Sequence, residues 1–497
     1  MNPGAATTVF PALSALLILP LAGALVALAL SRDAASCRRL ALGISLAELA
    51  LILALPLLNG PGPLHVAEDF AWISAMGARY HLGLDGLSYV LVLLTAVLQV
   101  LAVLVSWREV ERSVGFYFFC LLASQASANG IFLARDLFLF ALFWEFQLVP
   151  MFLLIGVFGH EEKRAAAAKF LIFSLAGGLA MLLAIAGLGL AQAGSTGLPN
   201  FSLAALLAQP VPPGLQLWLF TGFLLAVAVK VPILPLHTWL PDAHTQAPTA
   251  GSLILAGVLL KTGAYALIRL ALPLFPAAAQ AALPVLMFVG LLGLFYASWI
   301  ALAQTDAKRL VAYSSIGHMS LVVLGAAAGS PLSLTGSMLQ MLGHALSTGG
   351  LFLMVGMLSE RAGSRELADF GGLWRTMPVF GAFFLFLCLA AAGLPGLCNF
   401  PGEFMIIVGT FKDHPAAGAA AFAGLVLTLV YVLRLAAAVI FGRPGKKARH
   451  PDMTFREVLI LSGLTALILL LGLHPQPVLD LLTPAVTELL GARGGLP

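Results

Sequence analysis

The chain has 497 residues, of which 60% are hydrophobic and only 10% are charged, and its formal net charge is +4. Soluble domains average about 25% charged residues, so the composition excludes a soluble globular protein and predicts an all-α polytopic membrane protein. Its expected surroundings are the lipid bilayer, with no nucleic acid.

Cysteines and glycine motifs give no sign of a cofactor. The four cysteines are scattered without a C-x-x-C spacing, whereas iron–sulfur and zinc sites need clustered thiolates. The sequence has no P-loop and no G-x-G-x-x-G followed by an acidic residue. It therefore predicts no metal, flavin, haem or nucleotide site within this chain.

Fourteen membrane spans are predicted, since a spanning helix needs about 20 apolar residues. The first is interpreted as a retained span, because no charged segment precedes it and no convincing small-residue cleavage site marks a signal peptide. The spans lie near residues 11–30, 40–58, 82–106, 113–133, 136–158, 166–192, 214–235, 248–272, 280–302, 307–328, 333–358, 377–411, 418–441 and 454–473.

Prolines and glycines interrupt two of these spans. The segment KVPILPLHTWLPDAHTQAP follows the seventh span from Lys230 onward, and the twelfth span contains GLPGLCNFPGEF, which includes Glu403. The twelfth span is also too long for one straight crossing. Backbone that is not helical is tolerated at membrane depth only inside protein or against a water-filled cavity. We therefore expect helices 7 and 12 to be broken, each beside a charge.

Basic residues are unevenly distributed between the loops. The odd-numbered loops contain 18 of the 26 Lys and Arg residues, and the even-numbered loops with the tail contain five. By the positive-inside rule the odd-numbered loops are cytoplasmic. Both termini are therefore predicted on the opposite side of the membrane. The Ala-, Gly- and Arg-rich composition suggests a bacterium, so the predicted location is the inner membrane with both termini on the periplasmic side.

Six ionisable residues in the apolar segments form three pairs with a common spacing of 173 residues. A bilayer-buried charge costs about 2.5–3.5 kcal/mol even on the lenient insertion scale, so such residues are usually functional. Spans 4–8 and 9–13 are two units of five, and consecutive units of five insert with opposite topology. The pairs are Glu145 and His318, Lys230 and Glu403, and Lys261 and Arg434.

The duplication predicts four regions of the chain. Residues 1–112 form helices 1–3, and residues 113–275 form the first five-helix repeat, helices 4–8. Residues 276–445 form the second, inverted repeat, helices 9–13. Residues 446–497 form helix 14 and the tail.

Glu145, Lys230, Lys261 and Glu403 are the predicted charged members of a proton relay. A carboxylate and an ammonium group that approach and separate can exchange a proton, so Glu145 and Lys230 are interpreted as a switch. Lys261 is expected to relay protons toward the second half, and Glu403 is the predicted terminal acceptor. The alternatives are a static ion pair for Glu145 and Lys230, snorkelling for Lys261 and helix capping for Glu403.

Histidine titrates closest to neutral pH, which suits a proton relay. His318 and His344, in the tenth and eleventh spans, are predicted relay members. His237 and His244 flank the PD turn of HTWLPDAH and are interpreted either as the lining of an inlet or as structural histidines.

Three further charged residues are candidates for coupling between subunits. Glu109 and Asp136 lie near span ends, each beside an arginine, and are interpreted either as coupling residues or as solvated ion pairs. Arg434 is included as the partner of Lys261 in the duplication.

Four segments carry a resemblance to a known family: ALFWEFQLVPMFLLIGVFG, KVPILPLHTWLPDAHTQAPTAGSLILAGVLLKTGAYALIR, AYSSIGHMS and GLPGLCNFPGEFMIIVG. They resemble the antiporter-like membrane subunits of respiratory complex I, NADH:quinone oxidoreductase, over nearly the whole chain. Glu403, where paralogues usually have lysine, and the tail motif GLHPQPVLD resemble the chain M (subunit 4) family.

The resemblance implies a fourteen-helix subunit of a redox-driven proton translocase, flanked in the membrane arm by the antiporter-like chains L and N. It also implies that FMN, the iron–sulfur clusters and quinone are bound by other subunits. Alternative interpretations are a subunit of a multisubunit sodium/proton antiporter, or of a membrane-bound hydrogenase or a photosynthetic, ferredoxin-fed relative. A purely structural subunit is a third alternative, and the duplicated charges disfavour it.

Overall fold

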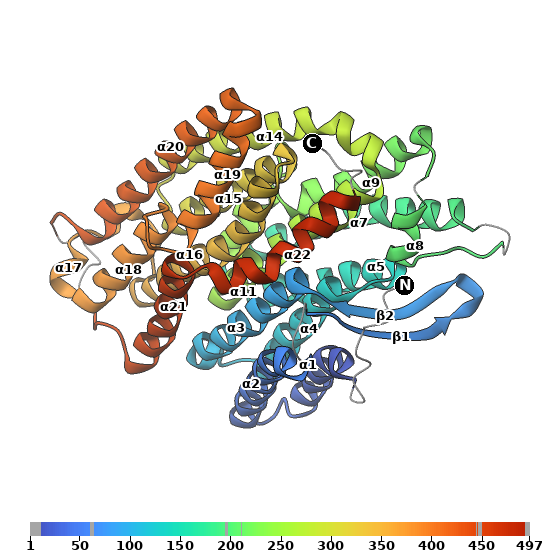
Figure 1. Ribbon diagram of the computed structural model, residues 1–497. Helices are drawn as coiled ribbons and strands as arrows, with labels where there is room; N and C mark the ends of the chain where they lie inside the picture. Colours follow the sequence, from blue (N-terminus) through green and yellow to red (C-terminus); the bar gives the residue numbers. More distant parts are fainter. Residues whose placement is uncertain are drawn as a thin grey trace.

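A computed structural model describes residues 11–59, 64–193, 197–209, 211–443, 445 and 450–492. The fold is a bundle of long helices (Figure 1). Thirteen helical segments of the described residues are long and apolar enough to cross a membrane. Lys446, Lys447, Arg449 and Arg493, which contribute to the loop-charge count, lie outside the described residues.

The described residues up to Glu109 form three α-helices and one β-hairpin. Helix α1 packs against α4, and α2 packs against α3. The hairpin strands are antiparallel, with Val66 opposite Leu84, and a short turn, η1 (Ser74–Met76), joins them through Gly77 at a φ of 69° that favours glycine. The elements are α1 (Ala12–Ala29), α2 (Ala34–Asn59), β1 (Val66–Ile73), β2 (Ala78–Leu84) and α3 (Gly86–Glu109).

The next group of helices corresponds to predicted spans four to seven and the short helix after the first break. The fifth predicted span is divided at Gln147, and the seventh ends at Lys230, where the predicted break begins. The helices are α4 (Val114–Leu133), α5 (Leu137–Phe146), α6 (Leu148–Phe158), α7 (Lys163–Ala191), α8 (Leu203–Ala208), α9 (Pro213–Lys230) and α10 (Trp239–Gln246).

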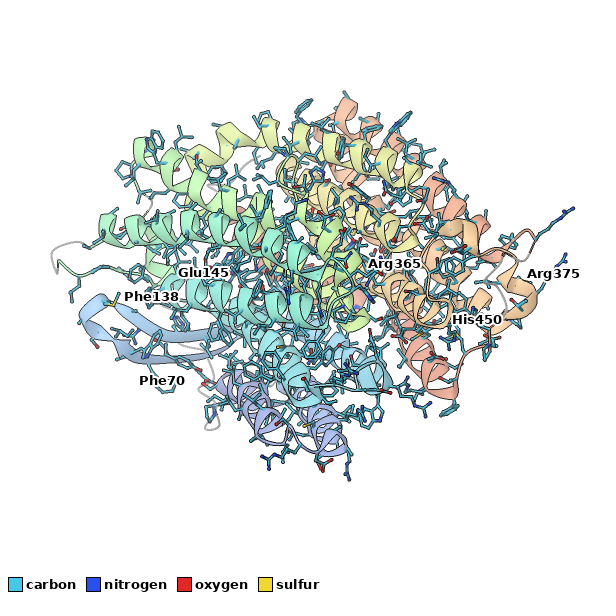
Figure 2. All side chains as sticks on the ribbon, turned by 180° about the vertical axis from the view of Figure 1, so that it is seen from behind. Phe70, Phe138, Glu145, Arg365, Arg375 and His450 are labelled. Atoms are coloured by element: carbon cyan, nitrogen blue, oxygen red, sulfur yellow. The ribbon has the colours of Figure 1, made fainter. Side chains whose placement is uncertain are left out.

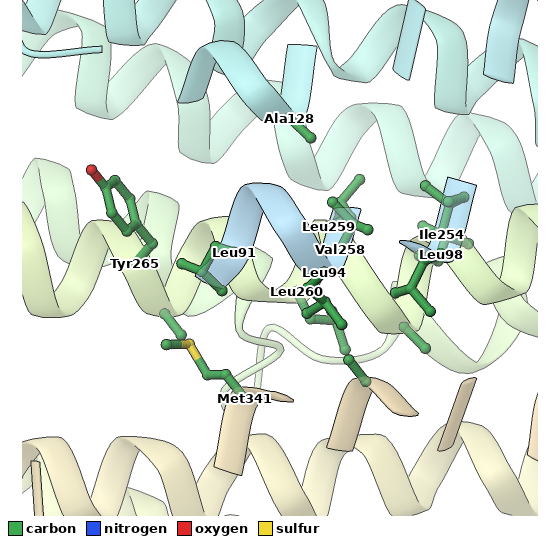
Figure 3. Close-up of a cluster of buried hydrophobic side chains, with 14 of the residues drawn as sticks. Leu91, Leu94, Leu98, Ala128, Ile254, Val258, Leu259, Leu260, Tyr265 and Met341 are labelled. Carbon is green, nitrogen blue, oxygen red and sulfur yellow. The ribbon is translucent and has the colours of Figure 1, made fainter. Parts of the chain in front are cut away.

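The eighth span is fully buried and alternates between α-helical and π-helical turns. Leucines of α3 and Ala128 of α4 pack against one side of it, and Met341 of α16 against the other (Figure 3). Its segments are α11 (Thr249–Ile254), η3 (Leu255–Leu259), α12 (Leu260–Ala266), η4 (Leu267–Ala271) and α13 (Leu272–Leu274).

The C-terminal half contains the second predicted break, between α18 and α19. Gly393 and Gly396 have positive φ angles there, of 71° and 89°, which explains why one straight helix cannot form. The elements are α14 (Pro276–Ala303), α15 (Ala307–Ala328), α16 (Pro331–Ala362), η5 (Leu367–Asp369), α17 (Leu373–Thr376), α18 (Pro378–Ala391), α19 (Asn399–Asp413), α20 (Pro415–Ile440), α21 (Phe455–Leu473) and α22 (Gln476–Ala492).

Helix α22 lies across the bundle, over α16, α3 and α13 (Figure 1). Beneath it, Asp85 caps α3 by accepting a hydrogen bond from Ser88 N, and it also pairs with Arg135 at 2.9 Å and Arg269 at 2.7 Å. Burial alone would raise the pKa of Asp85, but the two guanidinium groups outweigh it and hold this pKa below its ordinary value.

Replacing Asp85 by Asn is expected to destabilise the fold by about 3–5 kcal/mol, because two buried guanidinium groups lose their counter-charge. Since the pKa of Asp85 is lowered, its stabilising contribution is present above about pH 4 and is lost as the pH falls below that value. Thermal unfolding of the solubilised protein at several pH values measures both effects.

The control for this prediction is Asp69→Asn, which breaks the exposed Asp69–Arg79 pair, whose side chains are 42% and 46% exposed. Exposed pairs contribute about 0–1 kcal/mol. Equal losses of stability in the two variants would contradict the assignment of Asp85.

Candidate functional site

Glu145 and Lys230 lie near each other without forming an ion pair within 4 Å among the described residues. Lys230, the last residue of α9, is 1% exposed, and its Nζ donates to Gln147 Oε1 at 2.8 Å and lies 4.6 Å from the centroid of the Trp144 ring. Glu145 is half-buried, and its Oε1 has no hydrogen-bond partner in the described part of the chain. The structure therefore shows the pair separated, with an amide holding the ammonium group.

The Glu145 carboxylate lies against Gly178 of α7, on the side of the molecule away from Arg375 and His450 (Figure 2). A Cβ atom at position 178 would overlap Glu145 Oε1. The small residue therefore makes room for the carboxylate between α5 and α7.

Replacing Gly178 by Ala is expected to displace this carboxylate while the protein still folds. If Glu145 belongs to a proton relay, as the sequence predicts, this displacement should reduce proton transport by several-fold. Gly187→Ala on the same helix is the matched control, because a Cβ there meets only the flexible end of Leu219 at 3.0 Å. Transport measured in vesicles that contain each variant tests the prediction, and equal transport in both would contradict it.

Lys261 is fully buried in α12. Its Nζ lies 2.5 Å from His344 Nδ1 and donates to Ala256 O at 2.7 Å. Ala256 belongs to the π-helical segment η3, and such turns are frequent at functional sites. Lys261 therefore does not snorkel to an interface in this structure.

A second group of polar side chains continues from His344. The rings of His344 and His318 are 5.5 Å apart between centroids, and His318 Nδ1 lies 3.4 Å from Glu403 Oε1. Gln340 Nε2 donates to the same carboxylate oxygen at 3.2 Å. All four side chains are buried, so α15, α16 and α19 bring them together inside the protein.

Glu403 extends back toward the break that precedes α19. A Cβ atom at Gly393 would overlap its Oε2. The N-cap position of α19 is Cys398, and no side chain caps that end. Glu403 therefore does not act as the helix cap.

Thr262 is adjacent to the second group along the chain and lies near the first. It follows Lys261 in α12, and its Oγ1 lies 3.5 Å from Gln147 Oε1. We call the two groups together with Thr262 the polar row, which extends from α5 to α19. Its members are Glu145, Lys230, Gln147, Thr262, Lys261, His344, His318, Gln340 and Glu403. Among the described residues no hydrogen bond joins Glu145 to Lys230 or the Thr262 hydroxyl group to Lys261.

The sequence prediction missed the two amides of the row. Gln147 lies two residues after Glu145, and Gln340 lies one helical turn before His344. On a helix, residues four apart share a face, so the position of Gln340 relative to His344 was a usable signal.

The three remaining basic candidates lie outside these contacts. His237 stacks edge-on against Tyr296 with 5.2 Å between ring centroids, and His244 stacks on Phe352 at 4.2 Å. Both ring nitrogens of His244 are buried without a hydrogen-bond partner in the described residues. Arg434 is exposed on α20, so the structure does not bring it to its sequence partner Lys261.

Asp136 and Glu109 both accept backbone hydrogen bonds near helix ends. Asp136 caps α5 and accepts from Phe138 N and Leu139 N, which is a local structural role. Burial raises the pKa of Asp136 above its ordinary value. Glu109 accepts from Thr249 N at 2.9 Å and lines a pocket of about 580 Å³.

Metal ligands are not clustered in the described part of the chain, which contains no group of three or more His, Cys, Asp or Glu residues placed to hold a metal ion. Cys37, Cys120, Cys388 and Cys398 are all buried free thiols.

Comparisons with known proteins agree on one family. The family described as NADH:quinone oxidoreductase/Mrp antiporter, TM, matches residues 134–428. The NADH-quinone oxidoreductase subunit M of Pseudomonas aeruginosa is 47% identical over 416 residues, which cover 82% of each chain.

Solved structures are similar over nearly the whole chain. A chain of respiratory complex I from Thermus thermophilus with bound NADH has a TM-score of 0.89 and 32% identity, covering 97% of this chain and all of that one. A chain of the Mrp complex from Dietzia sp. has a TM-score of 0.83 and 24% identity, covering 95% of this chain and 52% of that one, which shows the shared fold alone.

Proposed function

Because the chain belongs to the transmembrane family shared by NADH:quinone oxidoreductase and Mrp antiporter subunits, and within it to the subunit M group, we propose that it translocates protons in complex I. In this proposal quinone reduction elsewhere in the complex drives the transport. The observation that carries it is the polar row, which runs from half-buried Glu145 to Glu403. It contains two lysines and two histidines that can gain and lose a proton, with neutral amide and hydroxyl groups between them.

Lys230 and Lys261 are the proton carriers of this mechanism. When the Lys230 ammonium group leaves Gln147 and approaches Glu145, the two charges stabilise each other. When it returns to Gln147, Glu145 is left half-buried without a partner and takes up a proton from water, while Lys230 can release its own proton and become neutral. A buried charge without a partner is costly, so each separation favours proton transfer along the row.

His344 and His318 transfer the proton from Lys261 to Glu403. The 2.5 Å contact between Lys261 Nζ and His344 Nδ1 supports the first step, and the 3.4 Å approach of His318 to Glu403 supports the last. His237 and His244 belong to the inlet side of the same mechanism, since His237 lies in the break after Lys230 and His244 in the short helix that follows it.

The surroundings follow from the same proposal. The chain lies in a bacterial inner membrane with both termini on the periplasmic side, between the antiporter-like chains L and N. Half-buried Glu145 and exposed Arg434 face outward toward neighbouring subunits. Glu109, and Asp136 in addition to its capping role, couple the subunits. FMN, iron–sulfur clusters and quinone are held by other subunits.

Purification of a tagged chain from gently solubilised membranes tests the proposal. Co-purifying NADH:quinone reductase activity, together with NADH-driven proton uptake after reconstitution into vesicles, is the expected result. An uncoupler should abolish the proton gradient and leave the redox activity.

A multisubunit sodium/proton antiporter is the second candidate function, because the matching family includes Mrp antiporter subunits. An intact complex without redox activity that exchanges sodium for protons across the vesicle membrane would support this alternative and overturn the first proposal.

A further inference from the structure

A buried carboxyl group lies outside the polar row, between the first helices of the chain. Glu48 is 0% exposed in the middle of α2, and Asn129 of α4 is 1% exposed. Asn129 Nδ2 donates to Glu48 Oε1 at 3.3 Å and to Leu16 O at 2.9 Å. Helices α2 and α4 contribute no member of the polar row, so this site is separate from it.

Two oxygen atoms of this contact have no hydrogen-bond partner among the described residues. They are Glu48 Oε2 and Asn129 Oδ1. Both oxygen atoms are hydrogen-bond acceptors when the carboxyl group is ionised, so no hydrogen bond can form between them in that state. A protonated carboxyl group has one O–H donor. With this donor, a carboxylic acid and a primary amide can form two hydrogen bonds to each other, O–H to the amide oxygen and N–H to the carbonyl oxygen.

Glu68 provides an internal comparison, because it is also a buried carboxylate against the first helix. It accepts hydrogen bonds from Leu13 N at 2.7 Å, from Ser14 N at 3.0 Å and from the Ser14 hydroxyl group at 2.5 Å. Three donors suit an ionised carboxylate. Glu48 has a single amide donor and takes part in none of the ion pairs of the described residues.

Further buried polar side chains lie between α3 and α4, about one helical turn along α4 from Asn129. The hydroxyl groups of Ser106 and Tyr117 lie 2.8 Å apart and fix the register of antiparallel helices α3 and α4. Gln99, seven residues before Ser106, is therefore level with Ser124, seven residues after Tyr117. The amide groups of Gln99 and Gln125 and the Ser124 hydroxyl group are buried without partners in the described residues.

We propose that Glu48 and Asn129 form a proton-binding site. Glu48 Oε2 carries the proton and donates a hydrogen bond to Asn129 Oδ1, and this second hydrogen bond completes a carboxylic acid–amide pair. The pair also fixes α2. The buried face of α2 is a single stripe that is apolar apart from Ser45 and Glu48. Hydrophobicity alone does not select one rotation of such a helix in a bilayer, whereas a hydrogen bond from Asn129 to Glu48 does. The stripe consists of Cys37, Ala41, Ser45, Glu48, Ile52 and Leu55.

Infrared difference spectra of the purified complex test this site. Subtracting the Glu48→Gln spectrum from that of the wild type should reveal the carbonyl band of a protonated carboxylic acid, and this band should move to lower frequency in D₂O. Gln can keep both hydrogen bonds to Asn129, so this variant is expected to fold. Glu68→Gln is the matched control and should remove ionised carboxylate bands instead.

Carboxylate bands in the Glu48 difference spectrum would overturn the proposal. If these bands also respond when choline replaces sodium in the buffer, the two oxygens bind a sodium ion rather than a proton. Should Glu48→Gln fail to assemble, Asn129→Leu gives the second test. The acid band must then move to higher frequency, since its hydrogen-bond acceptor is lost, and an unmoved band would also overturn the pair.

Discussion

Replacing Glu145 by Gln is expected to leave the complex assembled and to reduce proton pumping by at least about tenfold. Glutamine keeps the shape of the side chain in the space beside Gly178 but cannot gain and lose a proton. Positioned proton-transfer groups contribute about 10²–10⁴-fold to reaction rates, so the loss of one group should stop most of the flux. NADH-driven acidification of reconstituted vesicles measures the effect.

The matched control for this variant is Glu161→Gln, which removes a carboxylate from the exposed segment between α6 and α7. Its pumping should equal that of the wild type. Full pumping by an assembled Glu145→Gln complex would show that the row does not begin at Glu145, and the proposed switch with Lys230 would then have to be abandoned.

Replacing Lys261 by Met is expected to have an effect of similar size, at least about tenfold on pumping, because it interrupts the row at its centre. Methionine fills the space of the buried side chain without leaving an unpaired charge. It removes the contact of 2.5 Å with His344 Nδ1, which is the connection to the second half of the bundle. Assembly should remain intact, so the ratio of protons pumped to NADH oxidised is the quantity to measure.

Two comparisons make the Lys261 experiment specific. Lys412→Met changes an exposed lysine near the end of α19 and should pump normally. Arg434→Met should have a smaller effect than Lys261→Met, because Arg434 lies on the outer face of α20. A larger loss with Arg434→Met would mean that contact with a neighbouring subunit, rather than the buried row, limits transport.

The spans were predictable because a bilayer imposes length and hydropathy on any helix that crosses it. Both breaks were also predictable, since proline and glycine mark them beside Lys230 and Glu403. The hairpin formed by β1 and β2 was missed, because strands of seven and eight residues outside the bilayer leave no signal in a hydropathy window. The π-helical turns beside Lys261 likewise depend on packing against α3 and α16, which no local pattern specifies.

The site was predictable only in part, for a physical reason. A charged residue in an apolar span costs free energy and is therefore easy to recognise in the sequence, so Glu145, Lys230 and Lys261 could be identified as candidate site residues. Neutral amides cost less, and Gln147 and Gln340 were passed over although both contact the charged groups. The spacing of 173 residues also suggested that Arg434 resembles Lys261, but a spacing along the chain does not determine which face of a helix a residue occupies.

In the proposed mechanism, Gln147 has a consequence for proton leakage through the polar row. Its amide holds Lys230 and approaches Thr262, yet an amide neither releases nor accepts a proton at physiological pH. The row is therefore segmented rather than continuous, with an insulating spacer between the two lysines. A continuous row of proton-exchanging groups would let protons flow back and dissipate the proton gradient whenever both of its ends were open to water. If protons pass this spacer only when the side chains rearrange, each segment of the row can take up and release a proton in turn, without an open path across the membrane.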